Sequence, residues 1–127
     1  MSFLGPYILE DSEVLTMISG LSIAKTDFDK STTSLPIGDF VPLNSDVIAV
    51  AVRITTPFDQ PATISVGLQT DNQLFMAPSD IDPTQAGLFM EDVFYTLGQA
   101  DMPYIFVSAP GAAQGAGTVF VVLRSNS

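Results

Sequence analysis

The chain has 127 residues and a mass of 13.5 kDa, which fits a single domain that can bury about two-thirds of its extended surface. It contains no cysteine and no histidine, which excludes disulfides, thiolate nucleophiles, structural zinc sites and the commonest general base. Fourteen acidic residues against four basic ones give a net charge of −10, so we expect neither nucleic acid nor an anionic membrane surface as a partner.

The balance of apolar and charged residues is unusual for a soluble domain. Hydrophobic residues make up 46% of the chain and charged residues only 14%, against about 25% charged in an average soluble domain. Either the exterior is polar but uncharged, or other chains cover part of the apolar surface. No apolar run approaches the ~18 residues of a membrane span, and the N-terminus lacks the basic and apolar regions of a signal peptide. We therefore expect a protein that is made and used without export through a membrane pathway.

The first third of the chain differs from the rest in its pattern of apolar and polar residues. Residues 1–46 begin with an apolar stretch, continue through a polar stretch and are interrupted at Pro36-Ile37-Gly38. This pattern predicts an extended N-terminal arm with one or two short strands, and a β-sandwich core over residues 47–127. Arms of this kind become ordered when they lie on their own sheet edge or on a neighbouring molecule.

Two segments near the middle show strict alternation. Residues 47–55 and 62–68 place alternate apolar side chains on one face, and we expect these to point inward: Ile48, Val50, Val52 and Ile54 in the first segment, and Ala62, Ile64, Val66 and Leu68 in the second. The intervening stretch contains two prolines, which cannot donate to a strand ladder. The pattern predicts two strands joined as an antiparallel hairpin.

Further short elements follow at intervals of about a dozen residues or fewer. Apolar runs predict strands near residues 74–76, 88–90, 93–97, 104–108 and 118–124, and Asp and Pro residues predict a capped turn over 79–84. The glycine-rich residues 110–117 lack the lysine of a phosphate-binding loop, so we expect a hairpin connection there. This spacing predicts an all-β fold, an antiparallel β-sandwich of the jelly-roll kind.

Three acidic pairs are the strongest candidates for chemistry. Asp27 with Asp29 and Asp80 with Asp82 have the two-residue spacing of some calcium loops but lack the full calcium-binding pattern, so solvated or capping carboxylates are the simpler interpretation. A carboxylate-dependent hydrolase would need Asp80, Asp82, Glu91 or Asp92 to converge in a pocket. The chain has no tryptophan to form a sugar platform. We predict no catalytic residue, no metal site and no cofactor.

Residues 52–89 resemble a pattern found in small virion proteins of tailed bacteriophages. In that pattern a strand ends in T-x-F-D, a T-h-S-h-G strand follows (h is apolar), and h-M-A and an h-D-h-T turn complete it. The matching elements here are Thr56, Phe58 and Asp59, then residues 63–67, then Phe75-Met76-Ala77, then residues 80–84. Residues 115–121 also match, so the likeness covers residues 48–123 and leaves the first third unmatched. Pro83 replaces an expected apolar residue in the turn.

The resemblance implies a capsid decoration (cement) protein. Such a protein is a non-enzymatic β-sandwich on the exterior of the capsid that bridges neighbouring major capsid subunits, commonly as a homotrimer, in a virion assembled in the host cytoplasm. An apolar arm would supply the partner contacts, and its candidate residues are Phe3, Leu4, Tyr7, Ile8 and Leu9. The alternative is a tail tip or fibre module that binds a host glycan or receptor.

Overall fold

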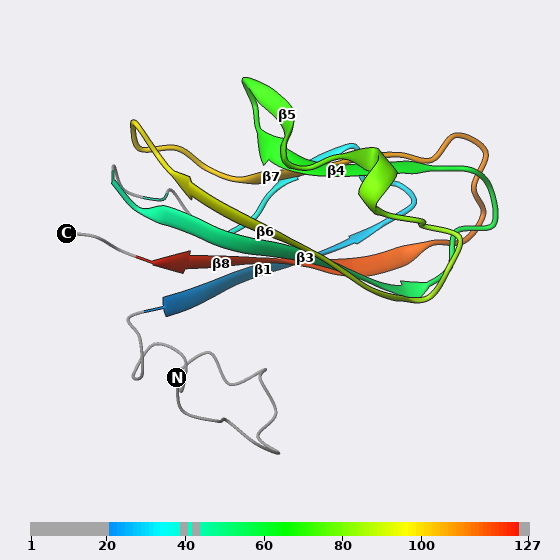
Figure 1. Ribbon diagram of the computed structural model, residues 1–127. Coiled ribbons are helices and arrows are strands. Elements are labelled where there is room, and N and C mark those ends of the chain that lie inside the picture. The colour runs from blue at the N-terminus through cyan, green and yellow to red at the C-terminus, as the bar shows by residue number, and fades with distance from the viewer. Residues whose placement is uncertain (1–20, 39–40, 42–43, 125–127) are drawn as a thin grey trace, which may run out of the picture.

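The computed structural model describes residues 21–38, 41 and 44–124 (Figure 1). These residues form eight strands and one turn of 3-10 helix: β1 (Leu21–Asp29), β2 (Ser34–Pro36), β3 (Asp46–Thr56), β4 (Thr63–Leu68), β5 (Asp71–Met76), η1 (Pro78–Asp80), β6 (Gly87–Thr96), β7 (Tyr104–Ser108) and β8 (Ala116–Arg124). The single capped turn predicted over residues 79–84 is two turns in the structure. In η1 the Asp80 Oδ2 accepts a hydrogen bond of 3.1 Å from the Ala77 N–H, and in the second turn the Gln85 N–H donates to the Asp82 carbonyl. Within the described part of the chain, no helix is long and apolar enough to cross a membrane.

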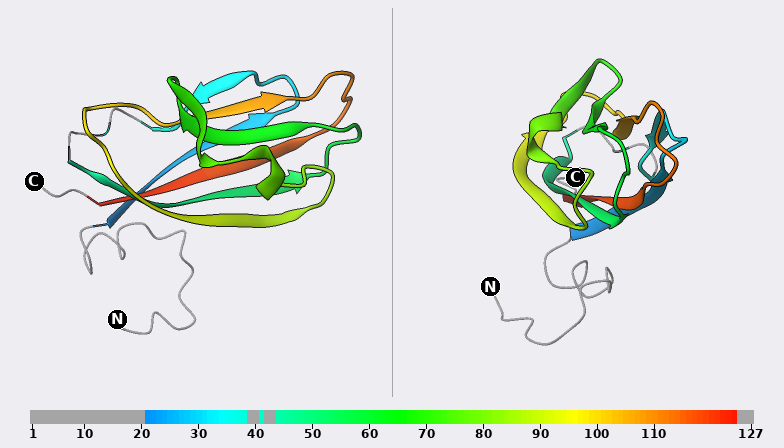
Figure 2. Two further views of the ribbon diagram at one scale, coloured as in Figure 1. Left: turned by 45° about the horizontal axis from the view of Figure 1, so that its top comes forward. Right: turned by 90° about the vertical axis from the view of Figure 1, so that its right-hand side faces the viewer.

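The strands form two four-stranded antiparallel sheets. The first sheet has the order β1-β8-β3-β6 and the second has the order β2-β7-β4-β5. Figure 2 shows them as two layers that close around a common interior. The predicted all-β antiparallel sandwich is confirmed.

Both sheets direct alternate apolar side chains into one core, as strand periodicity requires. The side chains that are almost fully buried come from strands of both layers and from the adjoining loops: Ile37, Val47, Val50, Val52, Ile54, Ile64, Val66, Met76, Leu97, Ile105, Val119 and Val121. At about 0.8 kcal/mol per buried CH₂ group, this interior supplies the main favourable term in folding.

The predicted hairpin between residues 47–55 and 62–68 is wrong. β3 pairs with β6 and β8 in the first sheet, whereas β4 pairs with β5 and β7 in the second. The connection between them crosses from one layer to the other, and the buried side chain of Phe58 lies in the core. The Phe58 N–H donates to the carbonyl of Pro83 instead of continuing a ladder (2.9 Å). β3 and β4 each carry a row of apolar side chains. Because the two strands lie in different sheets, both rows point into the shared core from opposite layers.

A β-bulge changes the inward row predicted for β3. The register shifts between Val47 and Ala49, so Val47 is fully buried and Ile48 is only partly buried. An extra residue in one strand reverses the alternation on one side of the bulge. The prediction for Val50, Val52 and Ile54 is confirmed, and the prediction for Ile48 is wrong.

The separate runs predicted at residues 88–90 and 93–97 belong to one strand, β6. Its pairing with β3 is irregular between Asp92 and Tyr95. Within this irregularity Phe94 has a φ of 50°, in the left-handed region that is costly for a bulky residue, and its side chain is 70% exposed. Because of this irregularity in the pairing, β6 continues as one strand of ten residues.

Two strands lie within the segment predicted as an arm. β1 pairs with β8 over nine residue pairs, and β2 pairs with β7 over three. Each is an edge strand of its sheet, and Phe28 of β1 contributes to the core. The described part of the sandwich therefore begins at Leu21, at the edge of the first sheet.

Candidate interaction surface

The predicted partner-contact residues Phe3, Leu4, Tyr7, Ile8 and Leu9 lie outside the described residues. The chain enters the described structure at Leu21, the first residue of edge strand β1. The contact role of these five residues stays a prediction.

The acidic pairs make local contacts in the fold. The Asp27 Oδ1 accepts a hydrogen bond of 2.7 Å from the Thr118 hydroxyl, and the Asp29 Oδ1 accepts one of 2.8 Å from the Ser31 N–H. The Asp82 Oδ1 accepts from both the N–H and the hydroxyl of Thr84. Among the described residues, no three acidic side chains gather into a group that could hold a metal ion. These carboxylates cap turns and join strands.

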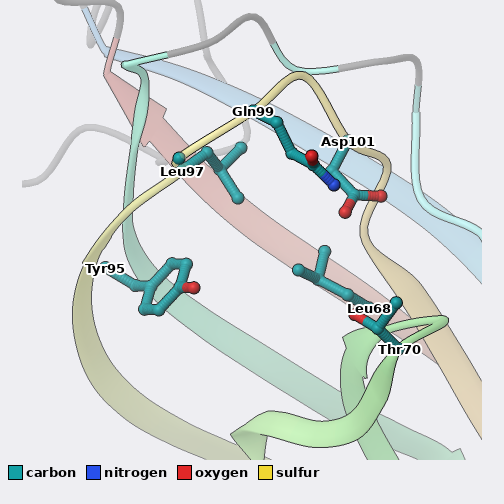
Figure 3. A pocket seen from close by; sticks show the side chains of 7 residues that line it. Leu68, Thr70, Tyr95, Leu97, Gln99 and Asp101 are labelled. Atoms are coloured by element: carbon teal, nitrogen blue, oxygen red, sulfur yellow. The ribbon is translucent and has the colours of Figure 1, made fainter.

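A hollow of about 320 Å³ opens between the end of β4 and the loop after β6 (Figure 3). Its lining residues are Leu68, Thr70, Tyr95, Leu97, Gly98, Gln99 and Asp101. The Tyr95 ring lies edge-on to Phe75 at 5.8 Å, and the Asp101 Oδ1 accepts from the Met102 N–H. None of Asp80, Asp82, Glu91 and Asp92 lines this hollow, so it does not hold the carboxylate pair that a hydrolase would need.

The hairpin connection expected at the glycine-rich residues 110–117 is wrong, because β7 belongs to the second sheet and β8 to the first. This loop between the layers is held by a carboxylate of the chain itself. The Asp59 Oδ1 accepts from the N–H groups of Ala113 (2.9 Å) and Gln114 (3.2 Å). These bonds, chiefly the one from Gln114, lower the pKa of Asp59 from its ordinary value of 3.8. Gly115 has a φ of 152°, and a Cβ there would lie 2.5 Å from the Phe58 ring. Both of these amide N–H groups are therefore engaged by Asp59.

The outward face of the first sheet is the most distinctive surface of the described residues. The register across the four strands aligns three rows on this face, each read from β1 to β6: Ile23, Val122, Ala49 and Asp92; Lys25, Phe120, Ala51 and Met90; Asp27, Thr118, Arg53 and Leu88. Seven of these twelve side chains are apolar and adjoin one another. We call this set the outer face.

Its largest exposed apolar groups lie on edge strand β6. Leu88 is 51% exposed and Met90 is 58% exposed. The guanidinium carbon of Arg53 lies 5.9 Å from the centre of the Phe120 ring, so the cation covers part of an aromatic side chain. An apolar face on an unpaired edge strand marks a site of association.

The second sheet has a different outward face. Its register aligns Pro36, Tyr104 and Gly67 in one row, and β2, β7 and β4 carry no charged residue. A Cβ at Gly67 would lie 2.2 Å from the carbonyl oxygen of Asp71, because β5 runs back over β4. Figure 1 shows β5 on the side of β4 that faces away from the first sheet. This sheet therefore covers part of its own outward face.

The four basic residues of the chain all belong to the first sheet or adjoin it. Lys25 and Arg53 lie on the outer face, Arg124 ends β8, and Lys30 follows β1. The Arg124 guanidinium donates to the Asp46 Oδ2 at 2.7 Å. Asp71 belongs to β5, whereas Asp59, Asp80, Asp82 and Asp101 lie outside the strands. Lys30 lies close enough to Asp59 to help lower its pKa. The outer face carries two basic and two acidic side chains, whereas β2, β7 and β4 of the second sheet carry no charged residue.

The outer face was not among the sites predicted from the sequence. The signal for it lies in residues 47–55, where Ala49 and Ala51 make the second face of the strand apolar as well. A half-solvated strand normally alternates apolar with polar residues. Two apolar faces on one strand indicate that something covers both.

Two solved structures share this fold over most of their length. A chain of the acidic stable capsid structure of Helicobacter pylori bacteriophage KHP30 is 16% identical, with a TM-score of 0.69, and the match covers 84% of this chain and 89% of that one. A chain of the capsid asymmetric unit of cyanophage Pam1 is 15% identical, with a TM-score of 0.61, and the match covers 81% and 83%.

No protein-family model and no curated protein sequence matches this chain. The structural likeness shows a shared fold at 15–16% sequence identity, where the sequence comparisons find no match. It agrees with the resemblance to small virion proteins of tailed phages that the sequence motifs gave. The chain has the β-sandwich fold of two chains found in phage capsids.

Proposed function

We propose that this chain is a non-enzymatic structural protein of a phage virion, located on the exterior of the capsid, where it bridges neighbouring major capsid subunits and stabilises the shell. The observation that carries the proposal is the match to a chain of a phage capsid over 84% of this chain and 89% of the other. Because the match covers most of both chains, the capsid chain contains no additional catalytic domain that this chain lacks.

The chemistry of the described surface supports a binding role. Asp27, Asp80 and Asp82 accept hydrogen bonds within turns or between strands. The hollow beside Tyr95 is lined by none of Asp80, Asp82, Glu91 and Asp92. The outer face combines exposed apolar groups with balanced charge, as the centre of an interface does. These features favour a protein that works by contact.

The capsid contact in this proposal is made by the N-terminal segment. The five candidate contact residues precede Leu21, the first residue of edge strand β1, at the rim of the first sheet: Phe3, Leu4, Tyr7, Ile8 and Leu9. Twenty residues reach at most about 70 Å when extended, which is enough to cross onto a neighbouring capsid subunit. There an apolar strand can add to a sheet edge and fill pockets with its side chains.

Association into homotrimers would multiply this contact. A trimer tethered through one arm gains effective concentration for the other two, so modest single contacts combine into stable attachment. Repeated over the shell, such bridges would resist its expansion and rupture.

The test is to remove residues 1–20 and measure binding to empty shells of the phage that encodes the protein. We expect a folded chain by circular dichroism that no longer co-sediments with the shells, while the intact chain does. A matched variant, Thr63→Ala on the second sheet, is expected to bind like the intact chain. Equal binding by the truncated and intact chains would refute the arm.

The copy number in purified virions separates this proposal from the alternative of a tail tip or fibre module. A decoration protein is expected in hundreds of copies per particle, and a tail module in a few. A low copy number together with binding to host glycans would replace the capsid role by a recognition role.

A further inference from the structure

The distribution of charge limits where two copies of this chain can meet. With a net charge of −10, two copies repel at long range and on most surface pairings. The outward face of the second sheet offers few charges for pairing between copies, because β2, β7 and β4 carry no charged residue. On the outer face, Lys25 and Arg53 stand beside Asp27 and Asp92, so the face carries both signs in equal number.

The arrangement of these charges also suits contact between the outer faces of two copies of the chain. The basic side chains come from β1 and β3, and the acidic ones from β1 and β6, with the apolar row of Phe120, Ala51 and Met90 between Asp92 and Arg53. A symmetric partner presents the same pattern rotated, which can set Lys25 or Arg53 of one copy against Asp92 or Asp27 of the other.

We propose that the outer face is the surface through which copies of this chain associate. The occupant is a second copy of the chain, with the apolar row of each copy covering that of the next and with charges paired at the rim. The inference deepens the proposed function, because a homotrimer would turn three such faces toward its axis. It does not require that the assembly bind a capsid.

The size of the face is adequate for this role. Four strands spaced about 4.8 Å apart, each with about nine residues that rise about 3.3 Å, give the whole outward side of the first sheet about 19 Å by about 30 Å, with the outer face at its centre. Side-chain relief raises this area of roughly 600 Å² toward the roughly 800 Å² that each partner buries in a standard interface. Met90 and Phe120 in the central row are the groups whose burial would contribute most.

The first experiment measures the mass of the full-length chain by sedimentation over a dilution series, for the native sequence and two variants. Met90→Glu adds a negative charge at an exposed position of the central row, and Thr63→Glu adds the same charge at an exposed position of the second sheet. We expect the native chain and Thr63→Glu to associate alike. We expect Met90→Glu to associate at least about tenfold more weakly, because a carboxylate would be buried among apolar groups.

A native chain that stays monomeric at the highest concentration would overturn the inference, and so would equal weakening by the two variants. Circular dichroism checks that both variants keep the fold, which the exposure of both positions favours. A stable dimer in place of a trimer would support the surface and contradict the trimer in the proposed function. The two proposals therefore fail separately.

The second experiment uses the absence of cysteine in the chain. The variants Met90→Cys and Thr63→Cys each carry one thiol, and the rate of its reaction with a maleimide reports its exposure. We expect Met90→Cys to react slowly at high protein concentration and rapidly on dilution, with Thr63→Cys unchanged. Protection of Met90→Cys that persists on dilution would show that a segment of the same chain covers the face, which would refute association through it.

Discussion

The two sheets of this sandwich are built alike on the inside and differently on the outside. Inner rows such as Val50 and Val52 in the first sheet and Ile64 and Val66 in the second are all fully buried. Outside, the second sheet folds β5 over Gly67 and carries no charge on its other three strands. The first sheet leaves Leu88 and Met90 open to solvent.

The difference shows which part of the sequence serves folding and which serves contact. Folding requires one apolar face from each sheet, and both sheets provide it. A second apolar face on the first sheet adds nothing to the core of the single chain and exposes an edge strand to unwanted pairing. Retaining such a face is consistent with its being covered in an assembly.

The largest expected effect comes from charging the inner face of the first sheet. Val52→Asp places a carboxylate among fully buried side chains with no base in reach, which costs several kcal/mol out of a total stability of about 5–15 kcal/mol. We expect no folded protein, measured as loss of a cooperative thermal transition and of strand signal in circular dichroism.

Arg53→Ala, one position along the same strand, is the matched control. Arg53 is exposed and its contact with Phe120 is a cation–π contact, worth about 0.5–1 kcal/mol. We expect the fold to survive with a small decrease in melting temperature. Comparable loss of structure in both variants would contradict the assignment of inner and outer faces in β3.

An intermediate effect is expected from Gly67→Ala on the second sheet. The new Cβ would lie 2.2 Å from the Asp71 carbonyl oxygen and 2.8 Å from the Asn72 carbonyl carbon, both backbone atoms that move only with β5. We expect a loss of about 1–3 kcal/mol in the free energy of unfolding, measured by chemical denaturation. Gly98→Ala, whose Cβ would meet nothing within 4 Å, is expected to be neutral. Equal stability of the two variants would show that β5 does not close over β4.

Much of the sandwich could be predicted because its strands follow local rules. Alternation in residues 62–68 identified buried side chains of β4, including Ile64 and Val66, and the apolar run of residues 118–124 identified strand β8. Aspartate and proline chemistry identified the turn at η1. These features depend on residues close in sequence, which a single sequence displays.

Other features depend on contacts between distant strands, and the prediction failed there. β3 pairs with β6 and β8, which are distant in sequence, instead of with β4. The connection that contains the buried Phe58 passes from one sheet to the other instead of forming a hairpin. The bulge at Ile48 follows from the pairing of β3 with both β6 and β8. The outer face likewise emerges only when Ile23, Val122 and Ala49 are placed side by side.

The smallest expected effect concerns Asp59, which joins the two layers at one end of the sandwich. This exposed carboxylate, in the connection between β3 and β4, accepts from Ala113 and Gln114 in the loop between β7 and β8. Because these bonds hold its pKa below 3.8 in the folded chain, the carboxylate stabilises the fold fully above that pH. The stabilisation is lost as the pH falls through the lower pKa of the folded state.

The isosteric variant Asp59→Asn tests this coupling between the layers. It keeps an oxygen acceptor but lacks the charge, so we expect slightly lower stability than the native chain at neutral pH, measured by thermal melting. We expect the difference in melting temperature between the native chain and the variant to stay constant down to about pH 4. Below that pH the difference is expected to disappear, because the native carboxylate then becomes neutral as well. A difference that persists unchanged in acid would mean that Asp59 acts through its shape instead of its charge, and the loop would then be held by the Phe58–Gly115 contact.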